Sequence, residues 1–600
     1  MPEPVPVPQP EPVMHEDRYA AAGGAASRSR RWDSGPQRLE AALSEAHDQE
    51  RRIRRRRLLG GGVAAVAAAG GLTTWGLASH SDPSSAAAPS ASDRPVRGGT
   101  LVYLDAESSR STQPQAAGTW QDSAYLENIT DRLVWKDPET GEIQPYIAES
   151  WHVSEDATTY TFRIREGVTY SDHTPLDAAS VKRNLEWQAR GDERNGIQPS
   201  TEWPRPTTIT SEGSTVTVRL RAPYNDFLDV LSGWGASLVA DRTINAPLET
   251  QQQITGIIGS GPFVVESEKY GERIVFARRT GYDWAPPGLR QQGEALLERV
   301  EVHAVTDDTT RLGTLRSGEA DAIRYIQPAD ERNLADEDGF QVLAAQGIGA
   351  TNQWHLRQSI PALQDVRVRR ALQVGIDRKT LLSDLYTDNW SVARSVVTED
   401  TVGFVDQEER LAFDPDTANG LLDEAGYDER DDEGYRTKDG ERLSLVTVID
   451  VYDATAKPLY QLVQSQLKEL GVQLILRDAD YSQVSEAYAA PDVAMVRSGW
   501  PYPAPWATLR TIWETSRTDD FAIEGGDPAL DELLADQATA KGERARASAL
   551  ADLQEYVVAN AYTIPLLKDS QIFAAKNDVN GLSWSAEARP LFYSTWLDRP

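Results

Sequence analysis

The chain has 600 residues, of which 40% are hydrophobic and 26% charged, and its net charge is -31. This length is too great for one simple core and predicts two or more domains. The negative charge argues against nucleic acid as a partner, because nothing would neutralise a phosphate backbone, and we interpret it as favouring solubility. The absence of cysteine excludes disulfides, thiolate chemistry and Cys-ligated metals.

Three segments precede the region that we expect to fold. Residues 1–50 are of low complexity and predict a disordered extension. Residues 51–79 join a run of arginines to an apolar stretch, which resembles a twin-arginine export signal. An uncleaved membrane anchor is the alternative, because the stretch approaches the ~20 residues that span a bilayer, but its many glycines and alanines favour cleavage. Residues 80–97 are rich in Ser, Ala and Pro and predict a linker. A lipid anchor attached to a cysteine side chain is excluded, because the chain has no cysteine.

The first folded elements are a short apolar strand at residues 100–104 and a helix at residues 125–135. Leu126, Ile129 and Leu133 recur at the spacing of one helical face.

A strand, a turn and a helix are predicted next. Apolar and polar residues alternate from Tyr160 to Ile164, which predicts a strand with one buried face. Residues 168–170 indicate a returning strand after a turn. Asp177 is the expected N-cap of a helix that carries Val181 and Leu185 on one side.

Further elements follow in the same way. Residues 216–220 alternate and predict a strand. In residues 259–263, Pro fixes one backbone angle and Gly permits unusual ones, which indicates a rigid turn before a strand. A phosphate-binding loop is rejected because no Lys-Ser/Thr follows. Asp365 and Asp377 are expected to cap two further helices.

A helix with Pro at its first position should begin after Asp414 and end at Gly426. We interpret the arginines at positions 367, 369 and 370 as a solvated helix face.

The later part of the chain predicts a βαβ unit at residues 443–476 and a buried strand at residues 493–496. The acidic stretch 427–440 is read as a hairpin loop, because Arg430 stands where a calcium loop needs an oxygen ligand. Ligand sites in such sheets lie at the carboxyl ends of strands. Residues 497–506, with three aromatic residues among the prolines, therefore predict a stiff, ligand-contacting loop rather than a helix or central strand.

Several of these stretches match a family signature in order. They are AESWHVSEDATTYTFRIREGVTYSDHTPLDAASV (148–181), IGSGPF (258–263), RLGTLRSGEADA (311–322), DVRVRRALQVGIDRKTLLSDLY (365–386), FDPDTANGLLDEAGY (413–427) and YTIPLL (562–567). Together they resemble the family 5, peptide/nickel-type, extracytoplasmic solute-binding proteins of ABC importers. The chain departs from the usual pattern at His173, where Gly is common.

The resemblance implies an α/β, two-lobed periplasmic-binding-protein type II fold with an extra subdomain in the first lobe. It places the chain crossings near residues 350–356 and 564–570. It also implies that residues 311–322 form a helix that leads to a buried strand. The implied divisions are first-lobe domain I at 98–145, 259–352 and 568–600, subdomain II at 146–258, and second-lobe domain III at 353–567.

The resemblance also marks candidate ligand-binding residues. The loop before the first helix would face the ligand, which selects Gln113, Trp120 and Gln121; an ordinary surface loop is the alternative. Trp234, between glycines, is either a stacking platform or a core residue. The complete set of candidates is Gln113, Trp120, Gln121, Trp234, Trp354, Trp390, Trp500, Tyr502 and Trp506.

Two departures bear on the ligand. Peptide-binding members commonly carry an Asp in the aromatic loop, which pairs with the ammonium of the peptide, but no acidic residue lies between Asp492 and Glu514. Either the other lobe supplies the acid or the ligand is not a free-amine peptide. No His follows His355, which argues against direct nickel binding, and we expect no metal and no cofactor.

The resemblance implies an exported monomer at the outer face of the cytoplasmic membrane or in the periplasm, cleaved from its signal or tethered by it. It would bind a peptide or another small molecule between closing lobes and deliver it to an ABC permease driven by a separate ATPase. An exported carbohydrate-processing enzyme is one alternative, but no nucleophile elbow, HExxH motif or marked carboxylate pair is present. A ligand-sensing subunit that does not transport is the other.

Overall fold

The computed structural model describes residues 94–109, 111–116, 120–200, 202–289, 291–449, 455–479, 483–499, 502, 504–514 and 526–599. The predicted N-terminal extension, the export signal and most of the linker lie outside these residues. Among the described residues, no helix has both the length and the apolar character needed to cross a membrane.

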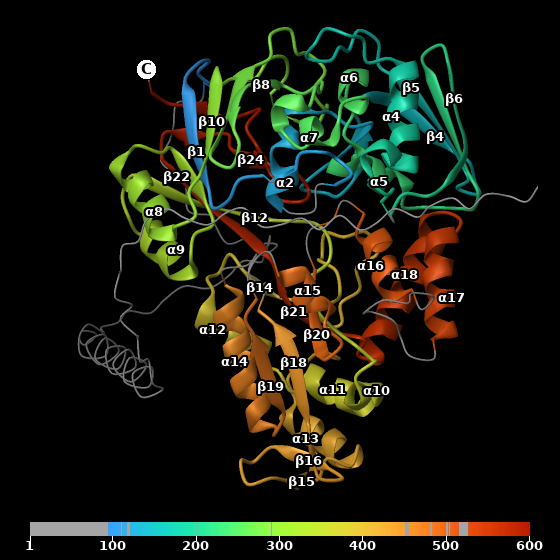
Figure 1. Ribbon diagram of the computed structural model, residues 1–600, viewed down its shortest axis with the longest axis vertical. Coiled ribbons are helices and arrows are strands. Elements are labelled where there is room, and N and C mark those ends of the chain that lie inside the picture. The colour runs from blue at the N-terminus through green and yellow to red at the C-terminus, as the bar shows by residue number, and fades with distance from the viewer. Residues whose placement is uncertain are drawn as a thin grey trace, which may run out of the picture. The chain divides into compact units, whose positions relative to one another are not determined.

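A seven-stranded mixed sheet organises the first lobe, which we define as residues 98–346 and 570–599 (Figure 1). Its central strand runs parallel to both neighbours. The strand that follows the second lobe inserts between two strands from earlier in the chain, antiparallel to both. In order the strands are β12 (Phe340–Gln346), β22 (Ser570–Lys576), β11 (Ala322–Arg324), β1 (Thr100–Asp105), β10 (Arg299–Ala304), β9 (Arg273–Arg278) and β8 (Phe263–Lys269).

A separate four-stranded antiparallel sheet forms the extra subdomain. Its strands are, in order, β4 (Ala148–Val153), β5 (Thr159–Ile164), β7 (Thr215–Leu220) and β6 (Pro206–Glu212). The predicted alternation is confirmed: Tyr160, Phe162 and Ile164 are buried, whereas Arg163 is exposed. The predicted returning strand at residues 168–170 is wrong, because β5 pairs with β4 and β7 instead.

The helix of this subdomain confirms its predicted cap. Helix α4 (Ala178–Arg190) begins after Asp177, whose carboxylate accepts a hydrogen bond from the backbone N–H of Ser180 at 2.8 Å. Val181 and Leu185 are buried on one side.

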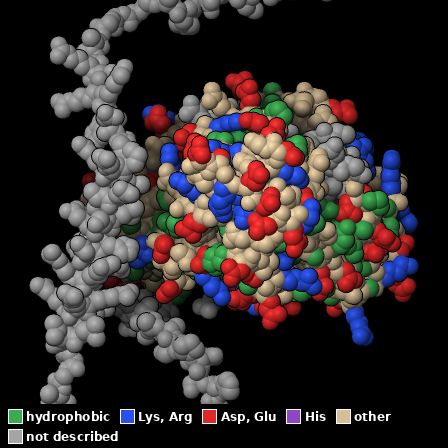
Figure 2. Space-filling model, turned by 90° about the horizontal axis from the view of Figure 1, so that it is seen from below, with side chains coloured by type: hydrophobic (Ala, Val, Ile, Leu, Met, Phe, Trp, Pro, Cys, Tyr) green, Lys and Arg blue, Asp and Glu red, His purple; other side chains and the backbone are tan. Residues whose placement is uncertain are grey.

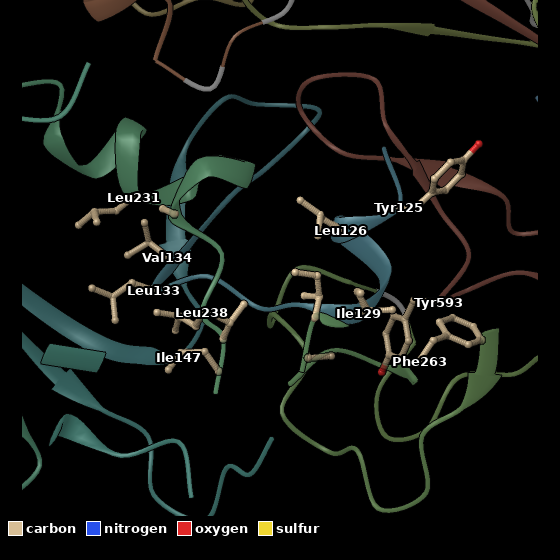
Figure 3. Packing of buried hydrophobic residues seen from close by; sticks show 14 of the residues in the cluster. Tyr125, Leu126, Ile129, Leu133, Val134, Ile147, Leu231, Leu238, Phe263 and Tyr593 are labelled. Carbon is tan, nitrogen blue, oxygen red and sulfur yellow. The ribbon is translucent and has the colours of Figure 1, made fainter. Parts of the chain in front are cut away.

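The helix predicted at residues 125–135 is much shorter in the structure. Helix α3 (Leu126–Ile129) ends at Thr130, whose backbone is extended, and residues 134–136 instead form strand β2 (Val134–Lys136), paired with β3 (Ile143–Pro145). The apolar residues are buried all the same, in the main core of the first lobe (Figure 3). A helical spacing of apolar residues therefore marked burial correctly and conformation incorrectly.

The Gly-Ser-Gly-Pro-Phe turn explains why α3 ends where it does. Gly261 donates a backbone hydrogen bond to the carbonyl oxygen of Ile129 at 2.9 Å. A Cβ added to Gly259 would lie 2.0 Å from that same oxygen. The turn thus packs backbone against backbone and leads into β8, as predicted.

The remaining helices of the first lobe lie around these sheets. They are α2 (Trp120–Ala124), α5 (Phe227–Ser232), α6 (Asp241–Ile244), α7 (Leu248–Gln251), α8 (Asp308–Ser317) and α9 (Pro328–Ala335). The predicted helix-to-strand passage at residues 311–322 is confirmed by α8 and β11. Two short antiparallel strand pairs complete the lobe: β24 (Ser583–Trp584) with β25 (Pro590–Leu591) as a hairpin, and β23 (Val579–Asn580) with β26 (Trp596–Leu597) on either side of it in the chain.

A six-stranded sheet organises the second lobe, residues 352–568. The predicted βαβ unit and buried strand are confirmed as β18, α14 (Ala456–Glu469), β19 and β20, with β18 parallel to both other strands. The order is β14 (Ser391–Val392), β21 (Thr563–Lys568), β13 (Asn352–Leu356), β20 (Val493–Ser498), β18 (Ser444–Val448) and β19 (Gln473–Arg477). A small sheet of β15 (Glu429–Arg430), β16 (Arg436–Lys438) and β17 (Glu441–Arg442) contains the hairpin predicted for the acidic stretch.

The helices of this lobe begin at the predicted caps. Asp365, Asp377 and Asp414 each accept a backbone N–H at the start of a helix. Arg369 is a correction to the predicted solvated face: it is 4% exposed and donates to the backbone carbonyls of Leu363 and Asn560. The helices are α10 (Pro361–Gln364), α11 (Val366–Val374), α12 (Arg378–Leu385), α13 (Pro415–Glu424), α15 (Val484–Ala489), α16 (Pro505–Trp513), α17 (Pro528–Thr539) and α18 (Glu543–Ala559).

Helix α16 corrects the predicted aromatic loop. Pro505 occupies its first turn and Trp506 lies inside it. Proline is tolerated there because its missing N–H has no partner within the helix in any case. The several prolines of residues 497–506 therefore did not exclude a helix, because this one starts at the last of them.

The chain passes between the two sheets twice. It leaves β12 at Gln346 and enters β13 at Asn352, and it returns from β21 to β22 through Asp569 alone. On the face shown in Figure 2, acidic and basic side chains are interspersed rather than gathered by sign.

Candidate functional site

The carboxyl ends of two parallel strands of the first lobe carry a buried ion pair. Asp105 ends β1 and Arg324 ends β11, and their side chains meet at 2.9 Å. Tyr125 donates to the other oxygen of Asp105 at 3.0 Å, and the Gln571 side-chain oxygen accepts two hydrogen bonds from Arg324. This edge of a sheet is where α/β proteins bind ligands.

Trp120 lies against this pair. The guanidinium carbon of Arg324 lies 3.4 Å from the centroid of the Trp120 ring. Trp120 starts α2 and is half-buried, and its indole N–H is buried without a hydrogen-bond partner among the described residues. A cation over an indole face is a favourable electrostatic contact.

A second arginine shares the tryptophan. The guanidinium carbon of Arg589 lies 5.2 Å from the Trp120 ring centroid and 4.8 Å from that of Trp234. Arg589 donates through Nε to the Ser123 hydroxyl at 2.9 Å and through Nη1 to the carbonyl of Glu587 at 2.6 Å. Burial lowers its pKa to about 10, against the nearby carboxylates of Glu587 and Glu127, which raise it.

The second lobe places its own polar group at the edge of its sheet. Arg497, near the carboxyl end of β20, pairs with Asp569 at 3.2 Å and donates to the Asn352 side-chain oxygen at 3.2 Å. Asn352 in turn donates to Asp569 at 3.0 Å. The residue between β21 and β22 is therefore bound to the amino end of β13 and the end of β20.

Tyr502 connects the two groups electrostatically. Burial raises the pKa of its phenol, Glu202 raises it further, and the charges of Arg497 and Arg589 lower it. One arginine of each lobe thus acts on the pKa of this phenol. We call Trp120, Trp234, Arg324, Arg589 and Tyr502 the aromatic–arginine cluster.

The structure brings only some of the predicted site residues together. Trp120, Trp234 and Tyr502 belong to the cluster. Gln113 has no exposed surface, and the carbonyl oxygen of the next residue, Pro114, is 3.8 Å from a Cβ built on Gly235, which follows Trp234. Gln121 follows Trp120 in α2 and is 9% exposed. Trp500 lies outside the described residues.

Three predicted tryptophans lie elsewhere. Trp354 has no exposed surface, and its ring packs 4.7 Å from that of Tyr460 in the core of the second lobe. Trp390 packs against Tyr386 at 4.5 Å. Trp506 is 3% exposed and donates to the carbonyl of Val402 at 2.8 Å. The structure thus shows these three rings in packing contacts outside the cluster.

The two arginines of the cluster were not predicted. Arg324 had a usable signal, because it lies at the end of the buried strand to which the predicted helix leads, at the sheet edge that favours ligands. Arg589 had none, because it lies in a hairpin whose position depends on the return of the chain to the first lobe.

Comparisons with known proteins agree with this architecture. Residues 142–520 match the family described as bacterial extracellular solute-binding proteins, family 5 Middle. A dipeptide-binding protein of Escherichia coli K12 is 25% identical over 427 residues, covering 68% of this chain and 76% of the relative. A glutathione-binding protein, GsiB, of Salmonella paratyphi A is 25% identical over 372 residues, covering 60% and 66%.

Solved structures share the fold. NikA from Brucella suis in complex with Fe(III)-EDTA has a TM-score of 0.71 at 24% identity, covering 83% of this chain and 100% of its own. The oligopeptide-binding protein AppA from Bacillus subtilis, in complex with a nonapeptide, has a TM-score of 0.70 at 16% identity, covering 84% and 100%. With the family match over more than half its length, the chain belongs to the bacterial extracellular solute-binding proteins of family 5.

Proposed function

We propose that this protein captures a peptide-like or other small solute between its two lobes, outside the cytoplasm, and delivers it unchanged to an ABC permease with a separate ATPase. The observation that carries the proposal is the aromatic–arginine cluster, in which Arg324 ends a strand of the first-lobe sheet and Tyr502 follows β20 of the second-lobe sheet. The two sheets are joined by two short passages, which suits a hinge. A ligand that contacts both edges would favour the closed arrangement.

The names of the relatives support the class of ligand. One is named for dipeptides and another for glutathione, and the structural neighbours hold a nonapeptide and a metal chelate. We infer a monomer that acts by stoichiometric capture rather than turnover. The apolar N-terminal segment would serve as its export signal or as its tether, with no lipid anchor.

The test is native mass spectrometry of the full chain purified from its own host. We expect one small solute per chain, released intact on denaturation and bound again by the refolded protein. Chemical conversion of the released solute on incubation with the protein would favour an enzyme. A protein that carries no solute, and takes up none from spent growth medium, would contradict the proposal.

A further inference from the structure

Arg589 is held in place by neutral contacts. Its guanidinium lies against the rings of Trp120 and Trp234 and donates to a serine hydroxyl and a backbone carbonyl. The residue is 3% exposed. These contacts orient the group and satisfy part of its hydrogen-bonding capacity, but none of them supplies a negative charge.

The other two arginines at these sheet edges have such a charge. Arg324 pairs with Asp105 at 2.9 Å and Arg497 with Asp569 at 3.2 Å. Arg589 makes no ion pair within 4 Å with any carboxylate of the described residues. A pKa of about 10 leaves it charged at neutral pH, and a buried charge without a direct partner is strongly unfavourable.

The carboxylates nearest to Arg589 are bound to other donors. Glu127 pairs with Arg132 at 2.6 Å, and Glu587 accepts from the Ser585 hydroxyl at 3.0 Å, its other oxygen having no partner among the described residues. Both favour the charged guanidinium at longer range. They moderate the local positive charge without forming a hydrogen bond to Arg589.

Two further donors, one in the cluster and one in the loop that precedes α2, are also buried and lack partners among the described residues. They are the indole N–H of Trp120 and the side-chain amide nitrogen of Gln113. Gln113 is fully buried and uses its oxygen to accept the backbone N–H groups of Gln115 and Ala116 at 2.6 and 2.7 Å. An acceptor brought by a solute would remove the free-energy cost of leaving these two donors unpaired.

We propose that Arg589 binds a carboxylate of the captured solute, with Trp120 and Trp234 packed around that group. The chemical class is a solute with a free carboxylate that needs no free ammonium, such as an N-blocked peptide. The planar guanidinium can offer a carboxylate two parallel hydrogen bonds. This inference rests on the proposed function and names the group that the site recognises.

The test offers the purified full chain three forms of one probe, a casein hydrolysate of short peptides. One portion is untreated, one is acetylated at its amines and one is amidated at its carboxyl groups. After gel filtration, the peptides retained by the protein are identified by mass spectrometry. We expect retention of the untreated and acetylated portions and at least about tenfold less of the amidated one, because a charged hydrogen bond is lost.

Two variants refine the test. Arg589→Gln should retain at least about tenfold less of the untreated portion. Arg279→Gln is the matched control, because Arg279 is also a buried arginine of the first lobe stacked on a tryptophan, Trp284, at 5.0 Å, but it lies outside the cluster. It should retain peptides as the wild type does. The peptide arms on the wild type remain decisive even if Arg589→Gln fails to fold.

The outcomes distinguish failure of the carboxylate site at Arg589 from failure of the proposed solute capture. Equal retention of amidated and untreated peptides would overturn the carboxylate site and leave capture intact, as would loss of binding on acetylation alone. Retention of none of the three portions by the wild type would count against peptide capture itself, and the carboxylate site would fall with it.

Discussion

His355 lies in β13 and is 3% exposed, with its ring bonded to the Ser498 hydroxyl and 6.3 Å from the ring of Trp513. Burial lowers its pKa to about 3, whereas an unfolded histidine has a pKa of about 6.5. Below pH 6.5 the imidazole of His355 takes up a proton in the unfolded chain but not in the folded chain. The free energy of unfolding should therefore fall as the pH drops from 6.5 towards 3, by about 2 kcal/mol at pH 5 from this residue.

Urea unfolding at pH 7 and pH 5 measures the effect. The stability difference between the two pH values should be smaller in His355→Gln than in the wild type by about that amount. His152→Gln, at an exposed position, should leave the difference unchanged. An identical pH dependence in wild type and His355→Gln would show that the buried ring does not resist protonation.

Single residues also show where sequence reasoning succeeds and fails. The capping aspartates were predictable, because a helix start needs a local acceptor and that acceptor is nearby in sequence. Arg369 and Arg589 were not, because their partners are backbone carbonyls or side chains far along the chain. An arginine in a sequence does not reveal whether it faces water, a carbonyl or a ligand.

At the scale of elements, the turn at Gly259 depends on space rather than on backbone angles. Because a Cβ there would lie 2.0 Å from the carbonyl oxygen of Ile129, Gly259→Ala must displace the turn or the end of α3. We expect a loss of at least about 2 kcal/mol in the free energy of unfolding, measured by chemical denaturation.

Gly313→Ala provides the comparison. Gly313 lies inside α8, and a Cβ there meets no atom within 4 Å, so alanine should stabilise the protein by about 0.5–1 kcal/mol through helix propensity. Equal effects of the two substitutions would refute the packing role of Gly259.

A helix or strand was predictable when the residues that determine it lie close together in the sequence. The βαβ unit of the second lobe follows from periodicity in one continuous stretch. The end of α3 at Ile129 does not, because it is imposed by a turn more than a hundred residues later. Likewise, β22 joins the first sheet only after the chain has built the second lobe.

At the scale of the whole molecule, residues 224–226 of the first lobe contact the helices of the second. Asp226 is 2% exposed and pairs with Arg546 of α18, while Asn225 donates to the carbonyl of Ala540 at 2.9 Å and Tyr224 accepts from Arg510 at 3.1 Å. Arg546→Met would leave the Asp226 carboxylate buried without its partner, which is strongly unfavourable. Separation of the lobes relieves this, so we expect a larger radius of gyration in X-ray scattering than for the wild type.

Arg316→Met is the control for loss of an ion pair. Arg316 and Glu337 pair within the first lobe with side chains 39% and 36% exposed, and such surface pairs contribute little. This variant should scatter as the wild type does. An unchanged radius of gyration in Arg546→Met would mean that the pair does not hold the lobes together.

The two-lobed plan was predictable because ordered motifs identified the family, but the contents of the site were not. The motifs contain turns and helix caps, whereas Arg324 and Arg589 lie outside them. Of the proposed site, sequence reasoning located Trp120, Trp234 and Tyr502 and missed the arginines between them.

The single residue between β21 and β22 has a consequence for measurement. Asp569 alone separates two strands that lie inside different sheets. No flexible loop is present there to take up a rotation of the backbone, so a rotation at Asp569 must move one sheet relative to the other. A donor dye on one lobe and an acceptor dye on the other would report that movement as a change in energy transfer. The doubly labelled protein could thus report ligand binding by fluorescence before its natural ligand is known.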